Sequence, residues 1–133
     1  MTLICALSRT PLVIIGPPGS SKTLSVNTVV GNANGEESCG PFYRNHPRLE
    51  PFHYQCSRLS TSLEIESVFK RAIERQGRYD HSQLQTLVFM DEAGLPEEEQ
   101  ESLKVLHYYL EGTWRLCVRL IRDQHPAKSR PVL

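Results

Sequence analysis

The stretch that decides the fold runs from Leu12 to Thr23 and reads LVIIGPPGSSKT. Its apolar part, residues 12–15, predicts a short buried strand, and the glycine- and proline-rich part that follows predicts a turn. Residues 24–30 can continue as a helix. A phosphate-binding loop requires a strand, then a turn of this kind that ends in Lys-Thr, and then a helix. The turn and the helix N-terminus direct backbone N–H groups at a polyphosphate. The stretch therefore predicts a nucleoside triphosphate site.

The loop departs from the strict pattern at one position. The pattern has glycine immediately before the lysine, and this chain has Ser21 there. Glycine lets the backbone approach a phosphate without a Cβ in the way, and serine is small enough to fit a slightly wider loop. Taken alone, the stretch also fits a turn that contains Lys-Thr by chance.

A second motif supports the phosphate-binding interpretation. Residues 87–92 read LVFMDE, four apolar residues followed by two carboxylates. A continuous apolar run suits a strand buried on both faces of a parallel sheet, and the acids then fall at its carboxyl end, where ligands bind in such sheets. This is the Walker B arrangement, in which Asp91 holds Mg²⁺ and Glu92 orients and polarises the attacking water.

The remaining pattern alternates strands and helices. Residues 51–56 predict a second strand, and residues 31–50 a long surface loop. Thr61 and Glu64 have the spacing of a capping box, and an amphipathic pattern follows until Gly77. A further helix is expected between Pro96 and Gly112. The order predicts an α/β fold, a parallel sheet with helices on both faces.

Composition excludes several classes of protein. The 133 residues suit one domain, with 39% hydrophobic and 23% charged residues, and fifteen basic residues cancel fifteen acidic ones. We expect no nucleic-acid partner and no membrane span, since no charge excess or long apolar segment is present. No pair of the four cysteines has C-x-x-C spacing, which favours reduced thiols in a cytoplasmic protein.

These residues resemble a known family. Residues 16–24 resemble the P-loop of an AAA+ unit, and the run from Met90 to His107 is similar to one branch, the mysterin family of giant AAA+ proteins that also carry a RING-type ubiquitin ligase module. Residues 52–57 are similar to the second strand of that family. The resemblance covers roughly residues 8–112 and implies a P-loop NTPase of three layers that binds ATP and Mg²⁺.

The resemblance assigns roles position by position. Lys22 would grip the β and γ phosphates, Thr23 and Asp91 would hold Mg²⁺, and Glu92 would be the catalytic base. The backbone N–H groups of Gly19 to Thr23 would cradle the phosphates. The nucleotide-binding positions implied are Gly16, Pro17, Pro18, Gly19, Ser20, Ser21, Lys22, Thr23 and Leu24.

The C-terminal part departs from that family. An AAA+ unit continues with a fourth strand ending in a polar sensor residue, an arginine finger and a helical lid, whereas this chain ends 22 residues after Glu111. Residues 114–121 alternate apolar residues with Arg or Cys, which suits a half-exposed strand better than a central one. We therefore expect a partial AAA+ domain over residues 1–112, a truncated or misannotated fragment that lacks its sensor strand and lid. Residues 113–133 are expected to form a divergent basic tail, poorly ordered. No RING pattern is present, so no ligase activity is expected of this chain.

Three functions remain open at this point. The first is ATP hydrolysis, in an intact parent protein whose neighbouring AAA+ units supply an arginine. The second is a module that binds Mg-ATP without turning it over, or turns it over very slowly, which suits the chain as given. The third is an incomplete sheet that exposes its central strand edge and aggregates.

Overall fold

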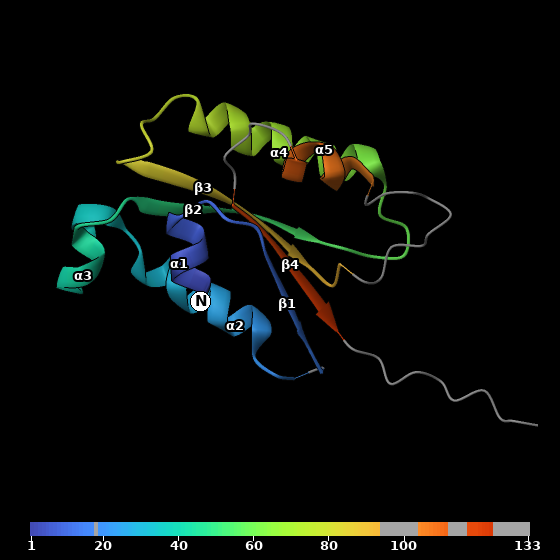
Figure 1. The fold of residues 1–133 in the computed structure, drawn as a ribbon, viewed down its shortest axis with the longest axis horizontal. Coiled ribbons are helices and arrows are strands. Elements are labelled where there is room, and N and C mark those ends of the chain that lie inside the picture. The colour runs from blue at the N-terminus through green and yellow to red at the C-terminus, as the bar shows by residue number, and fades with distance from the viewer. Residues whose placement is uncertain (18, 94–103, 112–116, 124–133) are drawn as a thin grey trace, which may run out of the picture.

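The structure is a computed structural model that describes residues 1–17, 19–93, 104–111 and 117–123 (Figure 1). Expectations for Pro18, for residues 94–103 and for Gly112 lie outside the described residues. The elements follow one another in the order α1 (Thr2–Leu7), β1 (Leu12–Gly16), α2 (Lys22–Asn32), a 3-10 turn (Gly35–Glu37), α3 (Pro41–Arg44), β2 (Arg48–Gln55), α4 (Ser62–Gln76), β3 (Leu84–Asp91), α5 (Val105–Glu111) and β4 (Cys117–Asp123).

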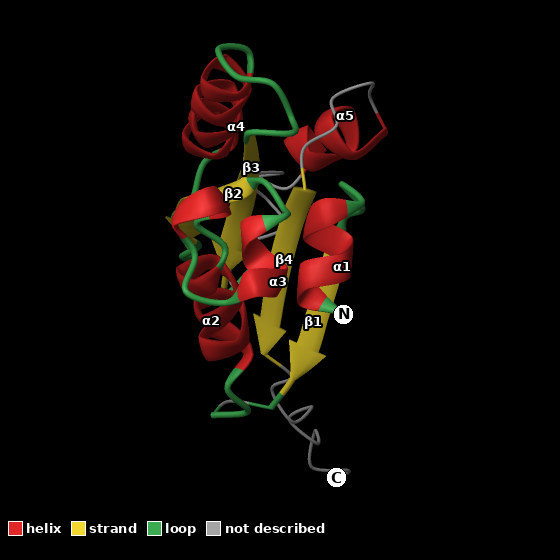
Figure 2. Cartoon of the chain, turned by 90° about the vertical axis from the view of Figure 1, so that its left-hand side faces the viewer, coloured by secondary structure: helices red, strands yellow, loops and turns green. Residues whose placement is uncertain are grey.

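The described strands form one parallel sheet in the order β1-β4-β3-β2. Helices cover both faces, with α4 and α5 on one side and α1, α2 and α3 on the other (Figures 1 and 2). The predicted α/β class, a parallel sheet between two helical layers, is confirmed. Since all strands run in one direction, their carboxyl ends share one edge of the sheet, and both motifs lie at that edge.

The missing fourth strand was a wrong expectation. Residues 117–123 form β4, and β4 pairs with β1 on one side and with β3 on the other. The alternating pattern pointed away from a central strand, but backbone pairing with residues far away in the sequence sets the place of β4. Residues 117–123, which we had assigned to a tail, form this strand, and the division of the chain at residue 112 stays a prediction. Residues 113–116 and 124–133 of that tail lie outside the described residues.

The strand β3 is the centre of the core. Val88 and Met90 pack with α4 and α5, and Leu87 and Phe89 pack with the helices of the opposite face. These four side chains are at most 2% exposed. Neighbouring residues on a strand point to opposite faces, so a strand with helices on both sides needs a continuous apolar run. The prediction for residues 87–90 is confirmed.

The strand β1 is less buried than its apolar sequence predicts. Ile14 packs in the cluster formed with α1 and α2, whereas Val13 and Ile15 are 52% and 55% exposed. These two side chains are exposed because β1 is the edge strand of the described sheet, whereas α4 packs on β2 and β3.

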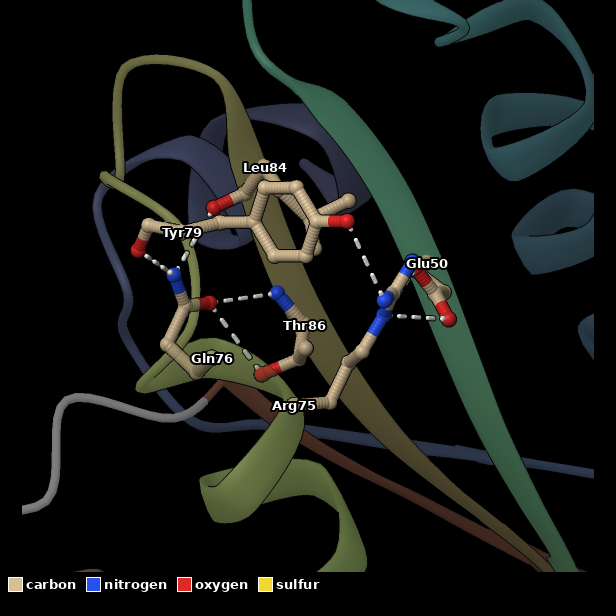
Figure 3. Close-up of polar contacts among 6 residues, drawn as sticks. All are labelled: Glu50, Arg75, Gln76, Tyr79, Leu84 and Thr86. Atoms are coloured by element: carbon tan, nitrogen blue, oxygen red, sulfur yellow. Dashed lines mark hydrogen bonds and ion pairs between the residues drawn. The ribbon is translucent and has the colours of Figure 1, made fainter.

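The beginning of β3 is joined to the end of α4 by a side-chain amide (Figure 3). Gln76 donates from Nε2 to the carbonyl oxygen of Leu84 at 2.8 Å, and its Oε1 accepts from the backbone N–H of Thr86 at 2.8 Å. Pairing between β3 and β4 begins only at Leu87. The amide of Gln76 therefore satisfies buried backbone groups at the start of β3, where an unpaired group would cost about 1–3 kcal/mol.

The helix α4 begins with the predicted capping box. The Thr61 side chain accepts from the Glu64 backbone N–H at 3.3 Å, and the Glu64 carboxylate accepts from the Thr61 N–H at 3.0 Å. Gly77 follows the last helical residue, but its φ of −62° is right-handed rather than the left-handed conformation of a C′ glycine. The capping box fixes the direction in which the chain enters α4 after β2.

Candidate functional site

The loop between β1 and α2 is shaped by two glycines. Gly16 ends β1, and a Cβ at this position would lie 2.9 Å from the Ser20 Oγ, so the Ser20 side chain would have to move. Gly19 has a φ of +78°, which residues with a side chain rarely adopt. Both glycines of the motif therefore have a steric reason, and together they turn the chain from the end of β1 into α2.

Ser21 takes the position where the strict pattern has glycine. Its φ of 60° and ψ of 28° are left-handed, and it is the N-cap of α2 without a side-chain cap bond. The sequence suggested that a Cβ near the phosphate would be the difficulty at this position. The structure adds a second difficulty, the backbone conformation, which costs a residue with a Cβ on the order of 1–2 kcal/mol.

Lys22 lies inside the loop. Its side chain reaches back so that Nζ donates to the carbonyl oxygens of Pro17 at 2.8 Å and Gly16 at 3.2 Å, and to the Ser20 Oγ at 3.2 Å. The residue is only 9% exposed. These oxygens hold the ammonium group at the concave side of the loop, between the end of β1 and the start of α2.

The two motifs meet at a direct hydrogen bond. Thr23 Oγ1 donates to Asp91 Oδ2 at 3.0 Å, across 68 positions of sequence. The other carboxylate oxygen of Asp91, Oδ1, accepts from the Glu92 backbone N–H at 2.9 Å. A hydroxyl and a carboxylate in contact at this edge are the protein ligands that Mg²⁺ takes beside phosphate oxygens and water. In the described part of the chain, no group of three or more His, Cys, Asp or Glu side chains forms a metal cage.

Glu92 is held in an uncommon conformation. It follows the last residue of β3 with a φ of 53°, and its Oε2 accepts from Gln55 Nε2 at 2.8 Å. A non-glycine residue with such a φ suggests a position where function outweighs backbone strain. Sequence analysis missed Gln55. The signal was its place near the end of the predicted second strand, which the register sets opposite Asp91.

A cavity of about 370 Å³ joins the two motifs. Asp91 and Glu92 line one side of it. The loop and the first turn of α2 line the other side with Gly19, Ser20, Ser21, Lys22, Thr23 and Leu24. Of the remaining predicted binding residues, Gly16 and Pro17 lie behind the loop as acceptors for Lys22, and Pro18 lies outside the described residues. Leu24 is 62% exposed.

Cys56 lies directly beneath the carboxylates. It is 1% exposed, and its backbone N–H donates to the carbonyl oxygen of Asp91 at 2.9 Å. Burial, with smaller contributions from the charges of Asp91 and Glu92, raises the pKa of this thiol to about 12. The thiol therefore stays neutral at physiological pH and adds no charge to the acidic side of the cavity.

The comparisons with known proteins agree with this geometry. The sequence profile described as the RNF213 AAA domain matches residues 1–128. The chain belongs to the RNF213 AAA domain family. This confirms the resemblance to the mysterin branch, and the match extends beyond residue 112, where we had expected the family sequence to end. An AAA domain is a nucleotide-binding module in its family, which suits a cavity lined by a lysine loop and paired acids.

Relatives of this RNF213 AAA domain chain include two ubiquitin ligases. It is 35% identical over 112 residues to mouse E3 ubiquitin-protein ligase RNF213 and 33% identical to the human protein, in each case over 84% of the chain. A Dictyostelium discoideum protein, described as an uncharacterized transmembrane protein, is 38% identical over 117 residues, 83% of the chain. The chain spans about 2% of the length of these relatives. Among the described helices, none is long and apolar enough to cross a bilayer.

Proposed function

We propose that this chain binds Mg-ATP between the loop at residues 16–24 and the acids at the end of β3, and that it hydrolyses ATP when assembled with neighbouring AAA+ units. The observation that carries the proposal is the Thr23–Asp91 hydrogen bond beside a cavity lined by both motifs. Residues 68 positions apart meet at the point where a phosphate-bound metal would need a hydroxyl and a carboxylate.

The residues present fit a magnesium-chelated triphosphate. The cavity has an ammonium group on the loop side and two carboxylates on the strand side, so it offers partners for both phosphate oxygens and a divalent cation. The left-handed Gly19 and Ser21 keep the loop open for backbone N–H groups to line it. The magnesium ion supplies charge neutralisation for the phosphate oxygens.

Each side chain has one task in this proposal. Lys22 exchanges some of its contacts with loop oxygens for phosphate oxygens, a change that needs only a small rotation of a long side chain. Thr23 and Asp91 hold the metal, and Asp91 also fixes the Glu92 backbone through Oδ1. Glu92 accepts a proton from the attacking water, and Gln55 sets where its carboxylate lies.

Hydrolysis also needs positive charge opposite the leaving phosphate. Neighbouring AAA+ units would supply that charge as an arginine in trans, which is worth several orders of magnitude in P-loop enzymes. The single chain is then expected to bind nucleotide and to turn it over slowly at most. The ligase activity in the names of the relatives belongs to proteins of which the match covers 2%, and the proposal does not extend to it.

Nucleotide binding without turnover is the second candidate. It is favoured by the Gln55–Glu92 hydrogen bond, which engages one carboxylate oxygen at 2.8 Å and so keeps it from polarising a water molecule. In this case the chain would act as a nucleotide-dependent structural unit. The two candidates share one binding site and differ only in chemistry.

Nucleotide affinity tests the site. Titration of the chain with a fluorescent ATP analogue and Mg²⁺ should give saturable binding that Lys22→Ala weakens by at least roughly tenfold, because a buried charge-assisted contact to phosphate is lost. Lys70→Ala is the matched control, since Lys70 is exposed and pairs with Glu66 on α4. If the Lys22→Ala protein bound the ATP analogue as tightly as wild type does, the proposed nucleotide site would be ruled out.

Turnover separates the two candidates. Phosphate release should be measured for the chain alone and mixed with neighbouring AAA+ units of a full-length relative, with wild type and Glu92→Gln compared in each mixture. Hydrolysis predicts release that Glu92→Gln abolishes while affinity stays within about twofold. Release that is absent throughout, with tight binding retained, would favour the nucleotide-dependent structural unit.

A further inference from the structure

A second and larger cavity lies at the opposite edge of the sheet. Its volume is about 580 Å³, within the usual range for small-molecule sites. The first residues of β2 and β3, Arg48 and Leu84, line it, whereas the cavity at the loop lies where the strands end. Its remaining walls come from the turn at Gly35, the residues after α3 and the C-terminal end of α4.

Three arginines line this cavity, and two of them are held in place. Arg44 donates from Nε to the Ser38 carbonyl oxygen at 2.7 Å and from Nη2 to that of Cys39 at 3.2 Å. Carbonyl oxygens orient the guanidinium without neutralising it. Arg44 therefore presents a full positive charge from a fixed position.

Arg75 is fixed by a carboxylate and a ring (Figure 3). Its Nε donates to both oxygens of Glu50 at 3.1 Å, and its guanidinium lies 4.6 Å from the centroid of the Tyr79 ring. The ion pair offsets the charge of Arg75. Tyr79, which is 43% exposed, becomes a stiff wall of the cavity.

Arg48 is the third arginine and the least engaged. It is exposed, and its side chain makes no hydrogen bond or ion pair with another described residue. Gly35, with a φ of +62°, lies close against its backbone, where an added Cβ would be 3.5 Å from the Arg48 nitrogen. Of the acids, Glu36 alone lines the cavity. Arg44 and Arg48 thus leave an excess of positive charge there.

We infer that this cavity binds a small molecule carrying at least two phosphate groups. An arginine fork matches phosphate oxygens in geometry, and a phosphate ester brings close to two negative charges, so two arginines without carboxylate partners suit two such groups. Ser82 and Gln83, which directly precede β3, offer further polar contacts to the same ligand. The inference is independent of the proposed nucleotide site, because the two cavities share no lining residue.

Inorganic pyrophosphate is the probe, and calorimetry measures its dissociation constant. Because the loop at residues 16–24 would also take up polyphosphate, the titration is run on the Lys22→Ala chain in the absence of nucleotide and Mg²⁺. Arg48→Gln is the main variant, since an exposed side chain without partners can be replaced without unfolding the chain. Arg71→Gln is the matched control, an exposed arginine on α4 outside the cavity.

We expect pyrophosphate to bind, and Arg48→Gln to weaken its affinity roughly tenfold, whereas Arg71→Gln leaves the affinity unchanged. Added salt should also lower the affinity. Arg44→Gln should also weaken binding, and its thermal unfolding curve shows whether the loop it anchors survives. Binding that is absent from the Lys22→Ala chain, or that Arg48→Gln and Arg71→Gln reduce equally, would overturn the inference. Citrate that binds as tightly as pyrophosphate would overturn the assignment to phosphates.

Discussion

Two residues with an uncommon backbone conformation lie at the edge of the sheet where β1 and β3 end. Ser21 and Glu92 both have positive φ, and both line the cavity between the two motifs. Such conformations persist only when surrounding contacts hold them. For Glu92 these contacts are the bonds to Asp91 and Gln55. For Ser21 no side-chain cap bond exists, so its strain is the easier one to relieve.

Replacing Ser21 with glycine should stabilise the chain. Glycine removes about 1–2 kcal/mol of left-handed strain and loses about 0.5–1 kcal/mol through the greater entropy of the unfolded chain, and the midpoints of these ranges give a net gain of about 0.75 kcal/mol. Urea unfolding of Ser21→Gly measures this gain. Ser20→Gly is the control, because Ser20 has no positive φ and its hydroxyl accepts from Lys22. Equal gains in both variants would contradict the explanation.

Breaking the contact to Glu92 should alter chemistry and leave binding unchanged. With Gln55→Leu, Glu92 Oε2 loses the donor that sets the position of its carboxylate, so we expect turnover to fall several-fold while ATP affinity stays within about twofold. Steady-state phosphate release and nucleotide titration report the two quantities. Gln83→Leu, at the opposite edge of the sheet, is the control. Unchanged turnover in the Gln55→Leu protein would show that the hydrogen bond has no role.

The sequence predicted the residues of the site better than their contacts. Lys22, Thr23, Asp91 and Glu92 were found by motif, and the structure brings all four to one cavity. Gln55 was not found, because its role follows from the register between β2 and β3 rather than from any local pattern. The roles assigned to these residues in binding and hydrolysis stay predictions.

At the scale of elements, α4 shows how a local signal becomes structure. Its capping box, hydrophobic stripe and terminal glycine all lie within the segment itself, and each was visible in the sequence. Tyr54 on β2 adds a tertiary contact, since its hydroxyl donates to Glu64 Oε2 at 3.1 Å. The cap thereby joins α4 to the strand that precedes it.

The cap makes the stability of α4 depend on acidity. The bond from the Thr61 backbone N–H, and then the Tyr54 hydroxyl, lower the pKa of Glu64. A carboxyl with a lowered pKa in the fold stabilises it above the unfolded pKa, and this contribution is lost as the pH falls through the folded pKa. Glu64→Gln should therefore reduce stability near about pH 7 and reduce it less near about pH 3.

Thermal unfolding at the two pH values measures this effect. Glu74→Gln, an exposed position on the same helix, should show no such difference between the two pH values. An equal loss of stability in Glu64→Gln at both pH values would show that the charge of Glu64 does not matter to the cap.

The element that could not be predicted is β4. A helix or a capped terminus depends on neighbours within a few residues, whereas the position of β4 depends on pairing of residues 117–123 with residues 12–16 and 87–90. Periodicity reports how exposed a strand is and not where it is inserted. The mixed pattern of residues 114–121 therefore predicted a possible strand but gave it the wrong place.

For the whole molecule, β4 connects β1 to the other described strands of the sheet. Among the described strands, β1 pairs with β4 alone, so β1 and the loop after it reach β3 through β4. A chain that ends at Glu111 should lose its cooperative thermal transition and aggregate, because β1 and β3 then expose unpaired edges. A chain that ends at Asp123 keeps every described strand and is the control.

Light scattering and calorimetry distinguish the two shortened chains. A cooperative transition in the chain that ends at Glu111 would show that residues 1–111 fold alone and would support the expected domain boundary near residue 112. Loss of the transition in both chains would assign an essential role to residues 124–133.

The two hydrogen bonds of the Gln76 amide restrict which amino acids position 76 can tolerate. The side chain at this position must donate a hydrogen bond to one peptide group and accept a hydrogen bond from another. Its amide must also stand three side-chain carbons away from the backbone to reach both. Glutamate at neutral pH and methionine have no hydrogen-bond donor, and lysine has no acceptor. Asparagine has both, but its side chain is one carbon shorter. A library of all twenty amino acids at position 76, sorted for soluble folded protein, should return glutamine almost alone.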